Sequence, residues 1–210
     1  MVICGNDLRE LINAGVITNV ADELINAGSI DITCRDVGYV EGVAPIKSVI
    51  KLLDKDDGRL KKIRLPYRLS PHESILLDSK QVFNLPEGRE VYYSAVGGLE
   101  NGHLYEPIAM RIAAPSSPHK PAIFAEYKLK STMARNFVDA YNAGWCDAGW
   151  NNARLTIELH NCNRWTSVII EPGIRIGQMI FYYGSTHVEK DLSYRTKGRY
   201  NNTMEVTPAR

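Results

Sequence analysis

The sequence has few cysteines, no long apolar run and no N-terminal targeting pattern. Its four cysteines form no C-x-x-C pair and no framework spacing, so we expect free thiols in a reducing compartment at Cys4, Cys34, Cys146 and Cys162. No stretch approaches the roughly 18 apolar residues that a membrane helix needs. The start, MVICGNDLRE, lacks a basic segment followed by an apolar run. We therefore expect a cytoplasmic protein without a membrane partner.

The chain also lacks a surplus of either charge. It carries 25 lysines and arginines against 24 aspartates and glutamates, a formal net charge of +1. Nucleic-acid-binding proteins usually display a basic surplus, so no nucleic-acid partner is expected, although a local cluster of cations could hold a small anion. With 44% hydrophobic and 23% charged residues, the composition is globular, and we expect a single domain over 1–210.

Side chains that could ligate a metal are sparse. Cys162 lies two residues from His160, and positions two apart on a strand share a face. A zinc site requires three or four ligands, and no second cysteine or histidine pair lies near these two in the sequence. We therefore expect no metal ion held by the protein itself.

The N-terminal residues favour two short helices, and the rest of the chain favours strands. Asn6 or Asp7 can cap the first helix and Gly15 can end it, with an apolar stripe at Leu8, Leu11 and Ile12. A second short helix is predicted around 20–25. Alternation of apolar and polar residues then predicts strands at 29–33, 48–53, 63–69, 74–77, 154–160, 167–170 and 176–183. Short strands at this spacing indicate a β-sandwich or β-barrel.

Two regions stand apart from this pattern. Residues 88–120 contain two turn signals and a Pro/Ser-rich run, which predict a hairpin-like insertion that could be a lid, an oligomer contact or a tolerated loop. The tail at about 190–210 interleaves cations with tyrosines. It is either a frayed terminus or a flexible arm that closes over an anion.

Three polar segments of the second half carry the candidate chemistry. In the first, Lys130 and Arg135 bracket two hydroxyls, a cluster that can hold a phosphate or form a solvated turn. In the second, 143–150, paired glycines and two tryptophans surround Asp147. In the third, 155–161, alternation puts Glu158 on the strand face opposite its leucine and isoleucine neighbours. A carboxylate there is either on a wet outer face or functional, with a raised pKa.

Together the three segments resemble the family of dCTP deaminases and archaeal-type dUTPases. The first matches the family pattern G-R-S-S-L-[AG]-R at Ser131, Thr132, Ala134 and Arg135. The second matches T-A-G-[FW]-I-D-[PA]-G-[FW] at Ala143, Gly144, Trp145, Asp147, Gly149 and Trp150. The third matches I-T-L-E-L-S-N at Thr156, Glu158, Leu159 and Asn161. Further matches, in family order, lie at 28–31, 171–178, 198–200 and 207–210, so the resemblance covers nearly the whole chain except about 88–120.

The resemblance implies a mainly β fold, a distorted β-barrel of the dUTPase-like (β-clip) type with short N-terminal helices. It also implies a homotrimer with active sites at subunit interfaces and deamination of dCTP to dUTP and ammonia without zinc. Glu158 would be the proton shuttle. Catalytic roles would fall on Ser131 and Arg135, on the main-chain carbonyl of Ala143 and on Asp147.

The resemblance further implies a nucleotide site for dCTP or dUTP, with Mg²⁺ accompanying the triphosphate. Its residues would be Lys130, Ser131, Thr132, Arg135, Asp147, Trp150, Gln178, Tyr194, Arg199, Tyr200 and Thr203. The chain departs from the family pattern where Leu129 and Lys130 replace Gly-Arg, where Arg199 replaces a lysine and where Thr203 replaces a glutamine.

Three functions remain open at this level. The first is dCTP deamination through Glu158. The second is a bifunctional deaminase and dUTPase that yields dUMP and pyrophosphate, or a dUTP diphosphatase, in which Asp147 positions the attacking water. The sequence around Asp147 is closest to that of the bifunctional members of the family. The third is a non-catalytic nucleotide-binding β-barrel.

Overall fold

The computed structural model describes residues 1–42, 60–90, 99–100, 103–104, 119–141 and 143–206. The first half of the chain contains α1 (Asn6–Asn13), β1 (Ile17–Thr18), the 3₁₀ helix η1 (Asp22–Leu24), β2 (Ile30–Glu41), β3 (Leu60–Arg64), β4 (Tyr67–Leu69), β5 (Ser74–Ser79), β6 (Val82–Asn84), β7 (Arg89–Glu90), β8 (Leu99–Glu100) and β9 (His103–Leu104). The second half contains β10 (His119–Lys120), β11 (Ile123–Leu129), α3 (Ser131–Arg135), β12 (Val138–Ala140), β13 (Trp145–Cys146), β14 (Asn151–Ala153), β15 (Thr156–Asn161), β16 (Val168–Ile170), β17 (Arg175–Tyr183) and α4 (Tyr194–Lys197).

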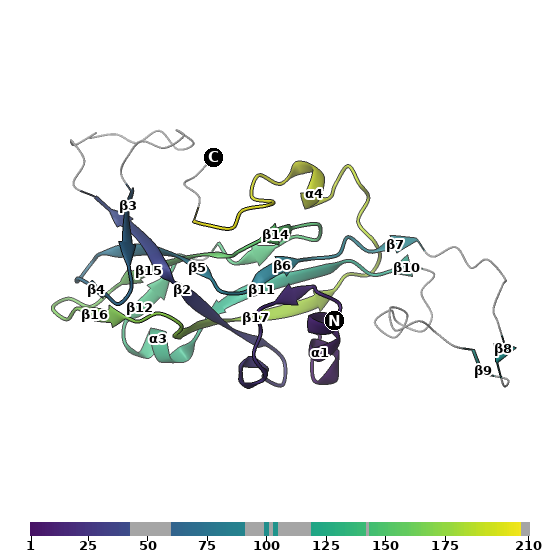
Figure 1. Cartoon of the computed structure of the whole chain (residues 1–210), viewed down its shortest axis with the longest axis horizontal. Coiled ribbons are helices and arrows are strands. Elements are labelled where there is room, and N and C mark those ends of the chain that lie inside the picture. Colours follow the sequence, from purple (N-terminus) through teal and green to yellow (C-terminus); the bar gives the residue numbers. More distant parts are fainter. Residues whose placement is uncertain (43–59, 91–98, 101–102, 105–118, 142, 207–210) are drawn as a thin grey trace.

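One large antiparallel sheet forms the body of the molecule. Its strand order is β12-β15-β5-β2-β17-β11-β13, and β3 pairs with β2. A smaller sheet, β1-β6-β14, packs beside it, and together the strands curl into a half-barrel (Figure 1). The predicted mainly β class is thus confirmed.

The core lies on the inner face of this curled sheet. In β15, Ile157 and Leu159 are buried, while Glu158 between them is half-buried. They pair with Leu77 and Ile75 of β5, which are buried as well. Each such side chain contributes about 1.5–3 kcal/mol on burial. The alternation therefore fixes which side chains of β15 point outward, Glu158 among them.

The two predicted N-terminal helices are present as α1 and η1. Leu8 and Leu11 of α1 are fully buried, as the apolar stripe predicts. The predicted end is also confirmed, since Gly15 has a φ of +72°, a conformation that glycine adopts without strain. The predicted cap is wrong: Gly5 occupies the N-cap position, and no side chain caps the helix.

Several predicted strands are confirmed, with one interruption. The segment 63–69 does not form one strand, because Pro66 has no N–H to donate to a ladder. Its two parts pair with different strands, β3 with β2 and β4 with β16. The predicted strand at 48–53 lies outside the described residues.

In the predicted insertion at 88–120, the described residues form two short antiparallel pairs. Strand β7 pairs with β10, and β8 pairs with β9. The remainder of 88–120 lies outside the described residues, as do 207–210. None of the described helices is long and apolar enough to cross a membrane.

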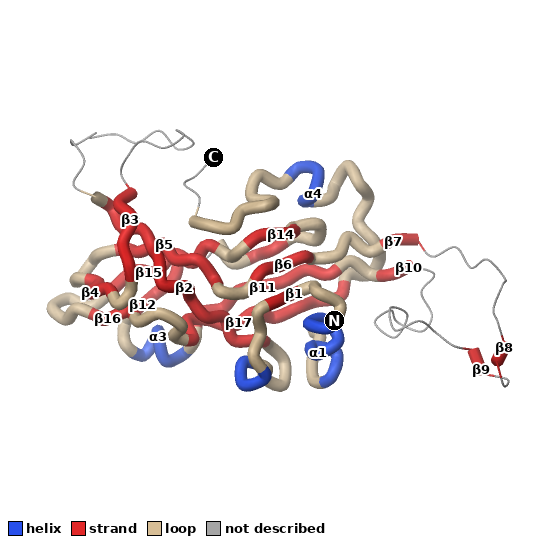
Figure 2. Tube along the Cα trace, in the orientation of Figure 1, coloured by secondary structure: helices blue, strands red, loops and turns tan. Residues whose placement is uncertain are grey.

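The C-terminal segment, 189–206, runs as a loop along β14 and contains only the short helix α4 (Figures 1 and 2). Figure 1 places it and α3 on different sides of the sheet, with α3 close to β12. The residues predicted to form the nucleotide site therefore lie in separate parts of a single chain.

Candidate active site

Glu158 occupies the middle of β15 on its outward face. The side chain is half-buried, and this burial raises the pKa of its carboxyl group, opposed in part by a hydrogen bond from its own backbone N–H. In the part of the chain that the structure describes, no other side chain forms a hydrogen bond or ion pair with this carboxylate. A sheltered carboxyl group without an internal partner can both accept and donate a proton to a ligand.

The backbone beside Glu158 connects the two edges of the curled sheet. Tyr141 donates its N–H to the Glu158 carbonyl at 3.1 Å, and Ala143 donates to the Tyr141 carbonyl at 2.8 Å. Tyr127 of β11 donates its N–H to the Gly144 carbonyl at 2.7 Å. A Cβ at Gly144 would lie 2.6 Å from the Tyr127 carbonyl oxygen, so only glycine allows this approach. Ala143 is thus positioned next to the strand that carries Glu158.

Tyr127 is a residue that the sequence analysis missed. Its side chain is 6% exposed, and its buried hydroxyl has no hydrogen-bond partner among the described residues. Burial raises its pKa, and the charges of Glu158 and Cys34 raise it further. A tyrosine at a buried position of an alternating strand is common, so the sequence carried no signal that distinguishes it.

Helix α3 presents polar side chains to solvent. Ser131, Thr132 and Arg135 are exposed, and their side chains form no hydrogen bond or ion pair with the described residues. No such contact links them to Glu158 within one chain. They are therefore available to a ligand or to a second copy of the chain.

Lys130, which precedes α3, is instead bound to the interior. Its Nζ lies 2.5 Å from Oδ2 of Asp31, a fully buried carboxylate that also contacts Arg175 at 3.5 Å and accepts a hydrogen bond from Asn26 at 2.9 Å. The predicted nucleotide contact of Lys130 stays a prediction. In the structure, the ion pair of Lys130 with Asp31 anchors the start of α3 to β2.

Gln178, another predicted nucleotide contact, lies in the same region. It pairs with Asp31 in the β17–β2 register. Its Oε1 accepts a hydrogen bond from the Ser29 hydroxyl at 3.4 Å. Asp31 thus has Lys130 as its ion-pair partner and Gln178 as its cross-strand neighbour.

The second polar segment forms a turn in which the two tryptophans differ. Trp145 is 56% exposed and donates its indole N–H to Asp147 Oδ1 at 2.8 Å, which holds that exposed carboxylate in place. Trp150 is 6% exposed and stacks on Phe83 at 5.1 Å. Its indole N–H donates to the Tyr200 carbonyl at 3.1 Å. Trp150 therefore packs in the core and anchors the C-terminal segment.

The C-terminal segment is docked on its own chain. The Ala148 carbonyl accepts the N–H of Tyr194 at 3.1 Å, and the Thr203 carbonyl accepts the N–H of Arg154 at 2.8 Å. The Thr203 hydroxyl donates to the Tyr200 carbonyl at 2.7 Å. Arg199 is exposed on this segment. Ordering of this segment over a nucleotide stays a prediction, and the structure shows where the segment lies in the single chain.

Comparisons with known proteins agree with this fold. Residues 117–184 match the family model described as dCTP deaminase-like, a range that includes α3, Asp147 and Glu158. The structure resembles the crystal structure of 2'-deoxycytidine 5'-triphosphate deaminase from Agrobacterium tumefaciens, with a TM-score of 0.57 over 87% of this chain. The sequence identity is 14%, so this likeness concerns the fold.

The chain spans 48% of the length of that Agrobacterium protein chain. A search of curated protein sequences finds no match. The match to the dCTP deaminase-like family model thus covers about a third of the chain, and the structural likeness agrees with it at the level of the fold.

Proposed function

We propose that the protein deaminates dCTP to dUTP and ammonia, with Glu158 as the proton shuttle. The observation that carries this proposal is the half-buried Glu158 carboxyl group, which has a raised pKa and no side-chain partner among the described residues. Water attacks C4 of the cytosine ring, N3 gains a proton, and ammonia leaves. One carboxyl group can take the proton from water and deliver it to the ring and the leaving nitrogen, provided that its pKa lies closer to neutrality than usual.

The remaining catalytic groups would come from a second subunit. Within one chain, the Ser131 and Arg135 side chains form no contact with Glu158 in the described part, and both are exposed. A neighbouring copy of α3 would supply a hydroxyl to orient the water and a fixed cation to stabilise developing charge. The Ala143 carbonyl would hold the exocyclic nitrogen. This arrangement requires a homotrimer or another symmetric oligomer.

Mg²⁺ would arrive with the triphosphate. The described residues contain no group of three or more His, Cys, Asp and Glu side chains placed to hold a metal ion. A magnesium ion bound mainly by phosphate oxygens and water fits this donor set. Thr132 and Arg199, both exposed, would contact the phosphates.

A second activity is favoured by the geometry of Asp147. The carboxylate is exposed and oriented by the Trp145 indole N–H at 2.8 Å. Such a fixed carboxylate could position water for attack on the α-phosphate of dUTP, which would release pyrophosphate and leave dUMP. The protein would then convert dCTP to dUMP in two steps.

Product analysis with dCTP and with dUTP, each with Mg²⁺, tests both activities. We expect Glu158→Gln to lower ammonia release about 10²–10⁴-fold, because the substituted amide cannot shuttle a proton. Asp147→Asn should lower only pyrophosphate release. The control is Glu23→Gln, which removes an exposed carboxylate of η1. If the unaltered protein leaves dCTP intact, or if Glu158→Gln is fully active, the deaminase proposal fails.

The pH dependence of deamination gives an independent check. The carboxylate form of Glu158 must accept the proton of the attacking water, so the rate falls as pH drops through its pKa. Since burial raises this pKa, the acidic limb of the rate profile should lie above the ordinary glutamate value of about 4.3. An acidic limb at or below that value would contradict the assignment.

A further inference from the structure

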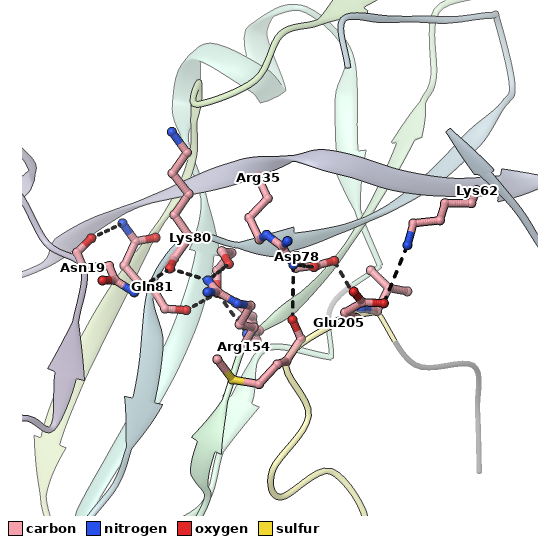
Figure 3. A network of polar contacts seen from close by, with 12 residues as sticks. Asn19, Arg35, Lys62, Asp78, Lys80, Gln81, Arg154 and Glu205 are labelled. Carbon is pink, nitrogen blue, oxygen red and sulfur yellow. Dashed lines mark hydrogen bonds and ion pairs between the residues drawn. The ribbon is translucent and has the colours of Figure 1, made fainter. Parts of the chain in front are cut away.

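A polar pocket of about 390 Å³ opens on strands β2, β3 and β5, at a place where the C-terminal segment passes (Figure 3). Its volume lies within the range of about 300–1,000 Å³ that small-molecule sites occupy. Three cations line it, Arg35, Lys62 and Arg64, together with the carboxylates of Asp78 and Glu205. No residue predicted to form the catalytic or nucleotide site lines this pocket.

The floor of the pocket is a fixed ion pair. Arg35 Nη1 lies 3.0 Å from Oδ2 of Asp78, whose side chain is 2% exposed. The same guanidinium nitrogen donates to the Met204 carbonyl at 3.3 Å, and the other Asp78 oxygen accepts the Val206 N–H at 3.2 Å. Asp78 therefore has both carboxylate oxygens engaged, and the pair joins the sheet to the C-terminal segment.

The rim of the pocket carries the less restrained cations. Lys62 approaches Glu205 at 3.7 Å, a loose pair in which both side chains are more than half exposed. Arg64 forms no ion pair with the described residues. Behind Asp78, Arg154 donates to the carbonyls of Ser79 and Lys80. Burial lowers the pKa of Arg154, and the positive charge of Arg35 lowers it further. The two guanidinium groups therefore repel each other across this part of the sheet.

We propose that this pocket binds a small phosphate-bearing anion, and that the Glu205 carboxylate is its internal competitor. Without Glu205, the charged lining residues are three cations and one carboxylate, a net charge of +2 that suits a phosphate group. Guanidinium groups bind phosphate through paired hydrogen bonds, and Arg64 is available for this. Because Glu205 lies beside Met204 and Val206, an anion that displaces it would act on the end of the C-terminal segment.

This site is separate from the candidate active site. Glu158 does not line the pocket, although its strand β15 is the neighbour of β5, where the pocket residue Asp78 pairs with Thr156. The other lining residues lie farther from Glu158, on β2 and β3 and in the C-terminal segment, so the two sites are neighbours that share no residue. The proposal does not depend on deamination, and its failure would leave the deaminase proposal intact.

Isothermal titration calorimetry of the 210-residue chain with inorganic pyrophosphate tests the pocket. We expect Arg64→Gln to weaken binding about tenfold, since one charge-assisted hydrogen bond is lost. Glu205→Gln should strengthen binding about threefold or more, because the competing carboxylate is gone. The matched control is Lys61→Gln, which removes an exposed cation of β3 that does not line the pocket. Thermal melting of each variant establishes that it is folded.

Two results would overturn the proposal. One is unchanged binding in Arg64→Gln or weaker binding in Glu205→Gln. The other is binding that is lost in Arg135→Gln but retained in Arg64→Gln, which would place pyrophosphate only at the candidate active site. The KM for dCTP should stay unchanged in Arg64→Gln. A KM that rises in step with pyrophosphate dissociation would make the pocket part of the substrate site.

Discussion

Helix α3 and the C-terminal segment were both predicted to contact the nucleotide, yet the chain supports them in opposite ways. The polar side chains of α3 are exposed, and the start of the helix is held by the ion pair of Lys130 with the buried Asp31. The C-terminal segment is held along its length by backbone hydrogen bonds and by Trp150. An anchored helix with unoccupied side chains can present them to another subunit without reorganisation, whereas a docked segment must exchange contacts before it can close over a ligand.

The largest expected effect is the loss of the anchor beneath α3. Asp31→Asn should lower the free energy of unfolding by about 3–5 kcal/mol, because it breaks a buried ion pair and leaves Lys130 without its partner. Urea denaturation measures this. As a control, Asp22→Asn removes the carboxylate of an exposed pair with Arg9 and should leave the midpoint unchanged. Equal effects of the two substitutions would show that the buried pair is not an anchor.

A somewhat smaller effect is expected where the C-terminal segment crosses Gly149. This glycine has a φ of +93°, and a Cβ there would lie 2.2 Å from the Ser193 hydroxyl oxygen. Gly149→Ala should therefore cost about 2–4 kcal/mol, since overpacking and a left-handed backbone both add to the cost. It should also speed tryptic cleavage at Arg195 and Lys197.

The matched control is Gly28→Ala, because a Cβ at Gly28 would meet no atom within 4 Å. If both alanine variants are cleaved at the rate of the unaltered protein, the docking of the segment does not depend on this close approach.

The smallest expected effect concerns the orientation of Asp147. Trp145→Phe keeps an aromatic ring near Phe124 and Tyr182 but removes the indole N–H that holds the carboxylate. We expect pyrophosphate release from dUTP to fall about threefold to tenfold, the effect of one hydrogen bond. Ammonia release from dCTP should not change. A parallel fall in both rates would mean that Trp145 acts on the whole site.

Local patterns predicted much of the fold. Alternation located β5, β15, β16 and β17, and the apolar stripe located α1, because these signals come from residues close in sequence. The interruption of the predicted strand 63–69 was missed, although Pro66 was its local signal. The cap of α1 was missed because a backbone conformation at Gly5 took the place of a side-chain hydrogen bond.

The candidate site was less predictable, since its contacts join distant parts of the chain. The resemblance located Glu158 and α3, but nothing in the spacing paired Lys130 with Asp31, 99 positions away. Burial of Trp150 against Phe83 and the unpartnered hydroxyl of Tyr127 likewise depend on how strands pack. Completion of the active site by a second chain would depend on side chains that a single chain leaves exposed, such as Ser131 and Arg135.

The ring of Tyr127 has a consequence for how this sequence can vary. A Cβ at Gly177 would lie 2.1 Å from that ring, so the space a side chain at 177 would need is already filled from β11. The two positions share one fixed volume in the core of the curled sheet. In proteins of this architecture we expect a large aromatic residue at the position of Tyr127 to accompany glycine at the position of Gly177. A bulkier residue in place of Gly177 should occur only where the residue in place of Tyr127 is small.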